Sequence, residues 1–300
     1  MASGSPPPPK EHGIFPGTYE ELHKAAREIM PMPFEGIKLS SNAASTPHFQ
    51  ASHTLALTAS QPSSYKFGAT YVGDNQGPEP GDQFPVLVSE MDTSGSLNAQ
   101  VIHQLTERMR GRFILQTEGT SWESLQMDAT YSGRDFSLTA VAANPDPLSA
   151  TGTFVGQFMQ GITPNVGLGT ELLYSKSAQG EKARLSLAGL FRGPRWQLAA
   201  SANPSSLTAS YYLKHSDTVQ LGAELNANFG DTMKHTALMV GYKLDVPVAN
   251  MTFRGMVDTN WTVGSVFEKR LAPYPFLFSL SAMLSHEQNA ARVGVGLTIG

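Results

Sequence analysis

The chain has 300 residues, of which 15% are charged and 40% are hydrophobic, and its formal net charge is −4. This composition excludes an acidic disordered chain and a coiled coil, and the negative balance gives no footprint for a nucleic-acid partner. The absence of cysteine excludes a disulfide framework and a thiolate metal site. An uncharged apolar run of about 18 residues, which a membrane-spanning helix requires, is also missing.

The first part of the chain has two patterns. Residues 1–17 are rich in proline, without the apolar stretch of a secretory signal, and we expect a disordered leader there. Residues 18–30 have apolar positions at helical spacing. Thr18 followed by Glu21 forms a capping box, and Pro31 stops the pattern. We therefore predict a helix over 18–30.

From residue 34 to residue 300 the pattern has a period of two. In 219–228, Val, Leu, Ala, Leu and Ala alternate with Gln, Gly, Glu, Asn and Asn, and similar runs recur along the chain. Each run has about ten residues and is bounded by turn signals rich in Asp, Asn, Gly and Pro. About nineteen strands are predicted from this spacing.

The length of these runs and their polar face favour a transmembrane β-barrel over a soluble β fold. Membrane strands need about nine to eleven residues with one apolar face, whereas soluble sandwiches have shorter strands with charged outer faces. A propeller would repeat every 40 to 50 residues or so, and the chain shows no such repeat. An odd barrel closes only if its first and last strands pair in parallel. Without a secretory signal, an organelle outer membrane is the expected location.

Motifs of catalysis or cofactor binding are missing from the sequence. The eight histidines lack paired ligand spacing, and no serine lies in a G-x-S-x-G turn. The pair Gly294 and Gly296 precedes no helix, so we interpret it as small residues in a curved strand rather than as a dinucleotide loop. We expect no enzymatic activity, no cofactor and no metal.

Several sequence blocks are similar to a known family. They are Phe15–His23, His48–Thr54, Phe67–Gly73, Gly95–Gln104, Tyr211–Asp217, Phe253–Trp261 and Gly296–Gly300. Through them the chain resembles, over nearly its whole length, the channel-forming subunit of the translocase of the mitochondrial outer membrane (the TOM complex) in its animal form. The resemblance implies a nineteen-stranded barrel with its N-terminal helix inside the pore, which passes unfolded precursor proteins across that membrane.

The resemblance also implies partners. These are precursor proteins with their presequences, the other TOM subunits including the central receptor and small single-helix subunits, a second copy of the chain, and membrane lipids. Two departures lie near the seam of the barrel. Ala43 follows Asn42 where the family commonly has Lys, and the last turn, which includes Glu287, is less basic than usual.

The last strand matches the sorting signal of the family, which is a polar residue, a glycine and two hydrophobic residues one position apart. The matching residues are Arg292, Gly294, Leu297 and Ile299. The resemblance implies that the machinery inserting mitochondrial barrels recognises this strand.

Charged residues on the predicted inner face are the remaining functional candidates. The acidic candidates for a presequence path are Glu90, Asp128, Glu171, Glu224, Asp258 and Glu268, and Asp245 also faces inward. The basic inward residues are Lys38, Lys66, Arg110, Arg112, Arg184, Lys214, Lys243, Arg254 and Arg292. Mixed charges of this kind either hydrate an aqueous pore and pair across strands, or attract the basic face of a targeting helix.

The alternative function is a metabolite pore like the voltage-dependent anion channel, with the same barrel and N-terminal helix. Such a pore should have a net-basic lumen, and the inward residues, nine basic and seven acidic, do not decide between the two functions.

Overall fold

The computed structural model describes residues 15–60, 62–77, 82–119, 121–146, 151–177, 180–230 and 235–300. Most of the predicted leader, residues 1–14, lies outside the described residues. Within the described ranges, no helix is long and apolar enough to cross a membrane.

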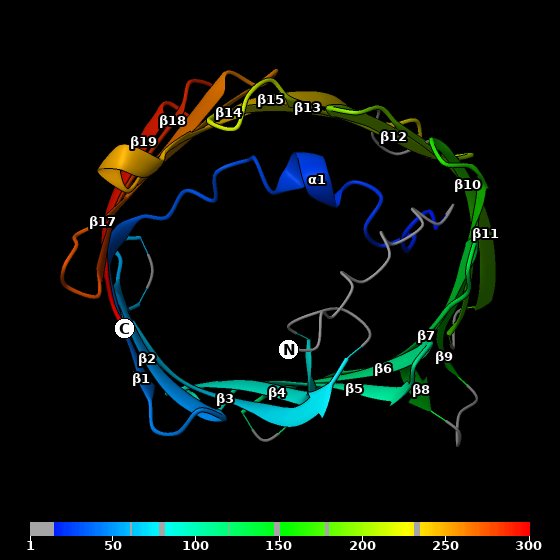
Figure 1. Ribbon diagram of the computed structural model, residues 1–300, viewed down its shortest axis with the longest axis horizontal. Helices are drawn as coiled ribbons and strands as arrows, with labels where there is room; N and C mark the ends of the chain where they lie inside the picture. Colours follow the sequence, from blue (N-terminus) through cyan, green and yellow to red (C-terminus); the bar gives the residue numbers. More distant parts are fainter. Residues whose placement is uncertain are drawn as a thin grey trace, which may run out of the picture.

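The described chain forms one closed nineteen-stranded sheet around a central opening (Figure 1). The strands are β1 (Gly36–Ala44), β2 (Phe49–Leu57), β3 (Ser64–Gln76), β4 (Gln83–Asp92), β5 (Leu97–Thr106), β6 (Met109–Glu118), β7 (Ser121–Ser132), β8 (Phe136–Asp146), β9 (Thr151–Thr163), β10 (Val166–Ser177), β11 (Gly180–Arg192), β12 (Trp196–Asn203), β13 (Ser206–Lys214), β14 (Val219–Asn228), β15 (His235–Val246), β16 (Met251–Asp258), β17 (Thr262–Arg270), β18 (Phe276–Ser285) and β19 (Ala290–Ile299). Both the fold class and the number of strands agree with the sequence prediction.

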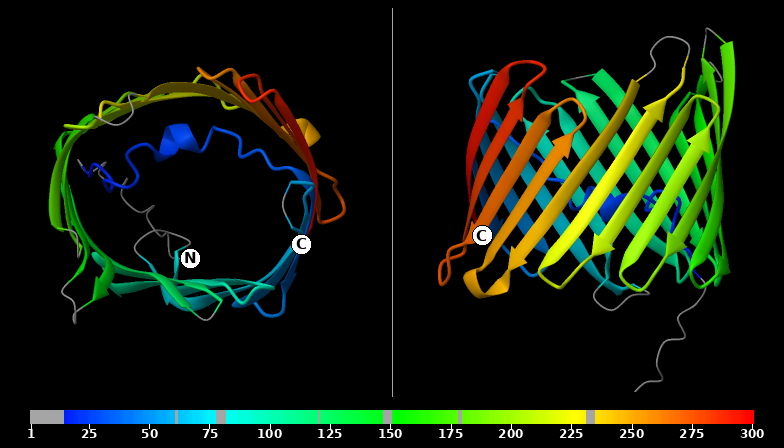
Figure 2. Two further views of the ribbon diagram at one scale, coloured as in Figure 1. Left: turned by 180° about the vertical axis from the view of Figure 1, so that it is seen from behind. Right: turned by 90° about the horizontal axis from the view of Figure 1, so that it is seen from above.

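The barrel closes between its first and last strands. β1 pairs with β19 in parallel, from Gly36 opposite Gly294 to Ser41 opposite Ile299, whereas every other neighbouring pair is antiparallel. Figure 2 shows the tilted strands from the side, with β19 returning to β1. An odd number of strands makes one parallel pair unavoidable, and the predicted closure is confirmed.

The two faces of the wall follow the alternation in the sequence. On β14, Glu224 points into the lumen, where it contacts the N-terminal segment, and the positions two residues apart from it share that face. Leu221 lies on the other face and is 39% exposed in the isolated chain. Large exposed apolar side chains recur on this outer face around the barrel, for example Leu87, Leu168, Leu185, Leu198, Tyr242 and Leu280. A bilayer covers these residues, so the exposed apolar band is the lipid-facing surface.

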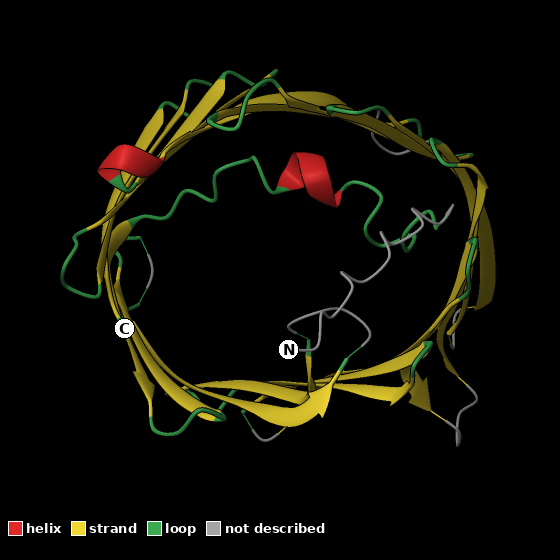
Figure 3. Ribbon diagram, in the orientation of Figure 1, coloured by secondary structure: helices red, strands yellow, loops and turns green. Residues whose placement is uncertain are grey.

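The N-terminal segment lies inside the pore, against one side of the wall (Figures 1 and 3). Its regular helix, α1 (Lys24–Arg27), is much shorter than the helix predicted over 18–30. Outside the pore, a short 3-10 helix, η1 (Pro247–Ala249), links β15 to β16. The prediction of a helix in the pore is correct in position and wrong in length.

Wall contacts explain why the helix is short. Hydrogen bonds between residues three apart, such as Glu21 N to Thr18 O at 3.2 Å, form turns before α1 begins. The Leu22 carbonyl accepts a hydrogen bond from Gln197 of β12 at 3.1 Å, which substitutes for a bond within a helix. Half of the capping box is present, because the Thr18 N–H donates to the Glu21 carboxylate at 3.3 Å. A segment this short does not sustain a helix on its own, so the wall determines its shape.

Candidate functional site

Residues 15–35 form a continuous strip along the inner wall, here called the lining segment. Near its start, Arg192 of β11 donates to the Pro16 carbonyl at 2.7 Å and Ser137 of β8 donates to the Gly17 carbonyl at 2.8 Å. Near its end, the Phe34 N–H donates to Ser281 of β18 at 2.8 Å. Among the described residues, Pro16 and Gly17, which fall in the predicted leader, already contact the wall.

Glycines on the inner face make room for the lining segment. A Cβ atom added to Gly222 of β14 would lie 3.1 Å from the Ala26 carbonyl oxygen. Further along the wall, a Cβ atom would collide with Met30 at Gly241 of β15 and with Phe34 at Gly294 of β19. At Gly222 and Gly294 the neighbouring atom is backbone, and at Gly241 it is the Met30 side chain, so these strands have glycine where the lining segment comes close.

An apolar cluster supports the first half of the lining segment. Leu22 and Met159 of β9 are almost fully buried, although both lie inside the pore. The members of the cluster are Leu22, Met159, Ala188, Leu190 and Ala199, with Tyr19 packed against them. Burying a leucine-sized side chain stabilises by roughly 1.5–3 kcal/mol, so this part of the lumen binds the segment by the hydrophobic effect.

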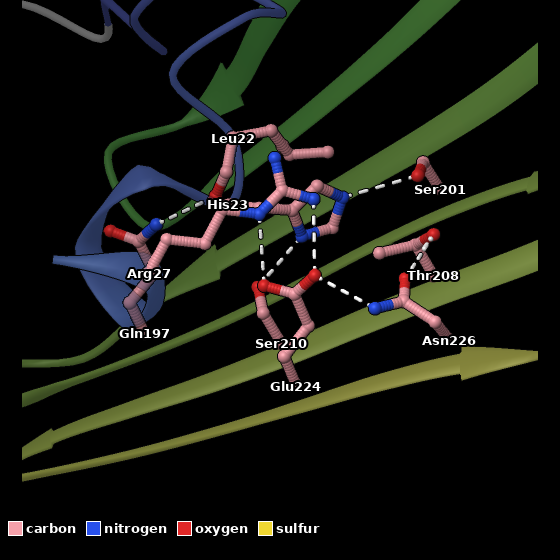
Figure 4. A network of polar contacts seen from close by, with 9 residues as sticks. All are labelled: Leu22, His23, Arg27, Gln197, Ser201, Thr208, Ser210, Glu224 and Asn226. Atoms are coloured by element: carbon pink, nitrogen blue, oxygen red, sulfur yellow. Dashed lines mark hydrogen bonds and ion pairs between the residues drawn. The ribbon is translucent and has the colours of Figure 1, made fainter. Parts of the chain in front are cut away.

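Arg27 attaches α1 to the wall through its guanidinium group (Figure 4). Its Nε and Nη2 atoms donate to the two carboxylate oxygens of Glu224 at 2.9 and 3.1 Å. Asn226 donates to the same carboxylate at 2.9 Å. The Glu224 side chain is only 10% exposed while that of Arg27 is 58% exposed, so the carboxylate is shielded, the guanidinium group meets the aqueous lumen, and the bidentate pair is geometrically specific.

His23 lies one turn before Arg27 and contacts two serine hydroxyls. Its Nδ1 atom is 2.7 Å from Ser210 Oγ of β13, and its Nε2 atom is 3.1 Å from Ser201 Oγ of β12. Burial lowers the pKa of His23 below its usual value, and the charge of Arg27 lowers it further, while Glu224 acts in the opposite direction. The neutral ring is therefore the form that suits this position.

Three of the carboxylates predicted for the presequence path lie on separate strands of the first half of the barrel. Glu90 of β4 pairs with Lys66 at 3.3 Å. Asp128 of β7 accepts from Arg112, which also reaches Glu20 of the lining segment at 3.0 Å. Glu171 of β10 accepts from a glutamine on β9 at 2.9 Å.

The other three predicted carboxylates also have partners. Besides Glu224, which is described above, Glu268 of β17 is 3.8 Å from Arg254. Asp258, at the end of β16, accepts the backbone N–H groups of Asn260 and Thr262 at 2.9 Å and so stabilises a turn. The six carboxylates are thus distributed around the wall, each with its own partner, and they do not form one cluster.

The four residues of the predicted sorting signal point to opposite faces of β19. Gly294 faces the lumen against Phe34, and Arg292, on the same face, is 3.7 Å from Glu35. Leu297 and Ile299 lie on the lipid-facing side, where Leu297 is in register with Leu39 of β1. The strand therefore presents a polar, small face inward and an apolar face outward.

Sequence reasoning missed the contacts of the lining segment. Arg27, His23 and their partners carried no recognisable motif, because residues more than 170 positions apart meet there. Glycines at lumen-facing positions of otherwise regular strands were the available signal. Strand curvature was the expected reason for Gly294 and Gly296. In the structure a Cβ atom at Gly294 would meet the backbone and ring of Phe34, and one at Gly296 would meet Ser279 Oγ and then the Phe34 ring.

A closed barrel with an odd strand number and an N-terminal segment in its lumen defines a class of membrane pore. The model of the eukaryotic porin family matches residues 15–294. The Xenopus tropicalis "mitochondrial import receptor subunit TOM40 homolog" is 42% identical over 285 residues, which cover 95% of this chain and 84% of that protein. The Homo sapiens protein of the same name is 43% identical, covering 95% and 78%. The chain therefore belongs to the eukaryotic porins and, within them, to the TOM40 family.

The chain is also similar to a further TOM40 relative and, weakly, to a solved porin structure. TOM40 homolog 2 of Drosophila melanogaster is 40% identical over 289 residues, covering 95% of this chain and 84% of that protein. Among solved structures, a mutant of the Rh. blastica porin has a TM-score of 0.47 at 12% identity, covering 77% of this chain and 95% of that chain. That structural likeness is too weak to support any inference.

Proposed function

We propose that this protein is the channel through which unfolded precursor proteins cross the mitochondrial outer membrane. The observation that carries the proposal is the nearly complete match to proteins named mitochondrial import receptor subunits, combined with a lipid-facing barrel whose lumen is polar and charged. The metabolite-pore alternative has no comparable support, because the relatives reported above carry the import name.

The lumenal carboxylates support passage by many weak contacts. Targeting helices are basic on one face, so the channel must offer carboxylates without retaining the cargo. Glu90 and Glu268 are partly exposed and bound to one basic side chain each, an arrangement worth about 1 kcal/mol or less per contact in a wet lumen. Several such contacts around the wall favour movement over tight binding.

Planar-bilayer conductance with the reconstituted full chain tests this function. We expect a preference for cations and a block by a basic presequence peptide that weakens as salt rises, because the contacts are electrostatic. Replacing Glu90, Glu171 and Glu268 together by glutamine should reduce both effects, whereas each single replacement should change little. The matched control replaces Lys66, Arg184 and Arg254 and should shift selectivity the opposite way. A channel that prefers anions and ignores the peptide at low salt would be a metabolite pore.

For the last strand we propose the role of a sorting signal. Leu297→Asp should prevent assembly in isolated mitochondria while leaving synthesis intact. Leu39→Asp is the matched control. Leu39 of β1 is paired with Leu297 and also faces lipid, so the same charge is placed at the same position on the neighbouring strand. Equal loss of assembly in the two variants would indicate a simple cost of charge in lipid and would exclude a sorting role.

Membership of the TOM40 family supports a proposal about partners. We propose that the chain works within the TOM complex, next to the central receptor, the small single-helix subunits and a second barrel. The exposed apolar outer face supports contacts of this kind with helices and lipids. Purification in mild detergent followed by mass spectrometry of the intact assembly tests the proposal.

A further inference from the structure

α1 and its flanks present an apolar face with one guanidinium group beside it, although Glu20, Glu21 and Glu28 outnumber the basic residues Lys24 and Arg27. Leu22, Ala26 and Ile29 form one face and are buried to 2%, 2% and 1% exposure against the wall. Arg27 extends beside this face to Glu224. An apolar face with a basic group beside it is also the pattern that a targeting helix presents to a channel.

The wall beneath α1 is built to receive such a helix, and we call it the α1 cradle. It consists of Gln197, Ser201, Ser210 and Glu224, which Figure 4 shows, together with Gly222; these residues come from β12, β13 and β14. The glycine provides room for a backbone, the carboxylate accepts a bidentate guanidinium group, and the hydroxyls and the amide offer hydrogen bonds. Each of these features suits a peptide helix that has an apolar face with a guanidinium group beside it.

The attachment of α1 is of a type that another helix can replace. α1 is a single turn whose stability comes from the wall and not from its own hydrogen bonds. Removal of Arg27 alone would leave the carboxylate of Glu224 without its cation, which is costly for a shielded charge. A second guanidinium group at the same place restores the two charge-assisted bonds. Exchange of α1 for a helix that carries a guanidinium group beside an apolar face therefore replaces the Arg27–Glu224 contact by one of the same kind.

We propose that the α1 cradle is a binding site for the basic amphipathic helix of an incoming precursor, and that α1 is its resident occupant, displaced during passage. This inference rests on the proposed channel function and names one site for its cargo. The anchors at Pro16, Gly17 and Phe34 lie outside the cradle, so the ends of the segment stay attached when α1 leaves the wall, whereas the packing of Leu22 against Met159 is given up.

A disulfide that locks α1 onto the wall tests the exchange. A Cβ atom at Gly222 would lie 3.5 Å from the Ile29 Cβ atom, which is within the range that disulfides require. The chain has no cysteine of its own, so Ile29→Cys with Gly222→Cys forms a single defined bond. The full chain is reconstituted in planar bilayers and exposed to a synthetic amphipathic peptide with arginines on its polar face.

We expect the half-blocking peptide concentration to rise about tenfold on oxidation of the double variant and to return on reduction. This is the size of effect expected when a charge-assisted contact is denied to the peptide. The two single-cysteine variants should not respond to oxidation. Equal block of the oxidised and reduced channel would overturn the inference and leave the channel function intact. An absence of block in the reduced channel and in the parent chain would overturn both.

A second measurement does not depend on the disulfide lock. Glu224→Gln keeps the shape of the side chain and should raise the half-blocking concentration as the lock does. In addition, a peptide carrying one cysteine should form a mixed disulfide with Gly222→Cys faster than with Gln100→Cys, which lies on β5 across the lumen. Equal or faster reaction at residue 100 would show that the peptide follows the uncovered wall, and would overturn the inference.

Discussion

The two sides of the lumen differ in how their charged residues are used. On the covered wall, formed by β8–β19, the lining segment lies over the strands, and the Glu224 side chain is only 10% exposed beneath Arg27. On the open wall, formed by β2–β5, Lys66 and Glu90 pair with each other while remaining 44% and 46% exposed. The same barrel thus contains one side that binds a peptide segment firmly and one side that stays hydrated.

This difference originates in the residues that face inward. The covered wall has glycines at the closest approaches, such as Gly222 and Gly241, and small hydroxyl side chains beside them. The open wall has longer charged side chains that reach across neighbouring strands. A lumen that passes a chain without retaining it needs a wall that holds the lining segment and a wall that stays hydrated. The two walls should therefore respond differently to substitution.

The largest expected effect concerns the outer face, where the two sides should not differ. Leu221 on the covered side and Leu87 on the open side are both 39% exposed to the surrounding lipid. Replacement of either by arginine should cost about 2–4 kcal/mol in the free energy of unfolding from lipid vesicles, measured by urea titration. Gln220→Arg, on the inner face, should cost little. Unequal losses at the two leucines would show that the difference between the sides extends through the wall.

The next effect separates the two sides directly. Gly294→Ala on the covered wall should destabilise by about 1–3 kcal/mol, because the new methyl group meets the backbone of Phe34, which has little room to move. Gly68→Ala on the open wall meets the hydroxyl of Ser52, which can rotate away, and should be nearly neutral. Urea unfolding of the purified, refolded variants measures both. A similar loss of stability at both positions would contradict the conclusion that Gly294 is required to make room for the lining segment.

A smaller effect is expected for the ion pairs. Arg27→Gln removes the bidentate contact to Glu224 and should speed amide hydrogen exchange in residues 15–35 about tenfold, which corresponds to roughly 1.4 kcal/mol. Lys66→Gln removes an exposed pair on the open wall and should leave exchange nearly unchanged. Equal exchange rates of residues 15–35 in the two variants would contradict the difference between the covered wall and the open wall.

The smallest effect concerns pH. His23 lies on the lining segment, outside the membrane-spanning strands, and burial lowers its pKa when the segment is docked. The undocked form therefore takes up a proton first, so docking is fully stable above the ordinary pKa of about 6.5 and weakens as pH falls below it. Hydrogen exchange in residues 15–35 should become faster between pH 8 and pH 5. His23→Gln should remove this dependence, and an unchanged dependence would assign it to another group.

The sequence predicted the wall of the barrel better than its contents. Alternation such as that of 219–228 depends only on which face meets lipid, and lipid imposes the same requirement on every strand. The path of the lining segment depends instead on side-chain pairs distant in the chain, such as Arg27 with Glu224, which no local pattern reveals. The capping box at Thr18 is half formed, as a helix start requires. The regular helix nevertheless begins later, because the wall makes its own hydrogen bonds to this segment, such as that from Gln197 to the Leu22 carbonyl.

The position of Phe34 has a consequence for the order of assembly. Phe34 lies against Gly294 of the last strand and bonds to Ser281 of the strand before it, while β1 begins two residues later. This anchor is therefore incomplete until the chain has been made and inserted to its final strand. Completion of the Phe34 anchor and closure of the cylinder therefore coincide, whereas the contacts of Pro16, Gly17 and Leu22 are made with strands β8, β11 and β12, which precede the final strand in the chain.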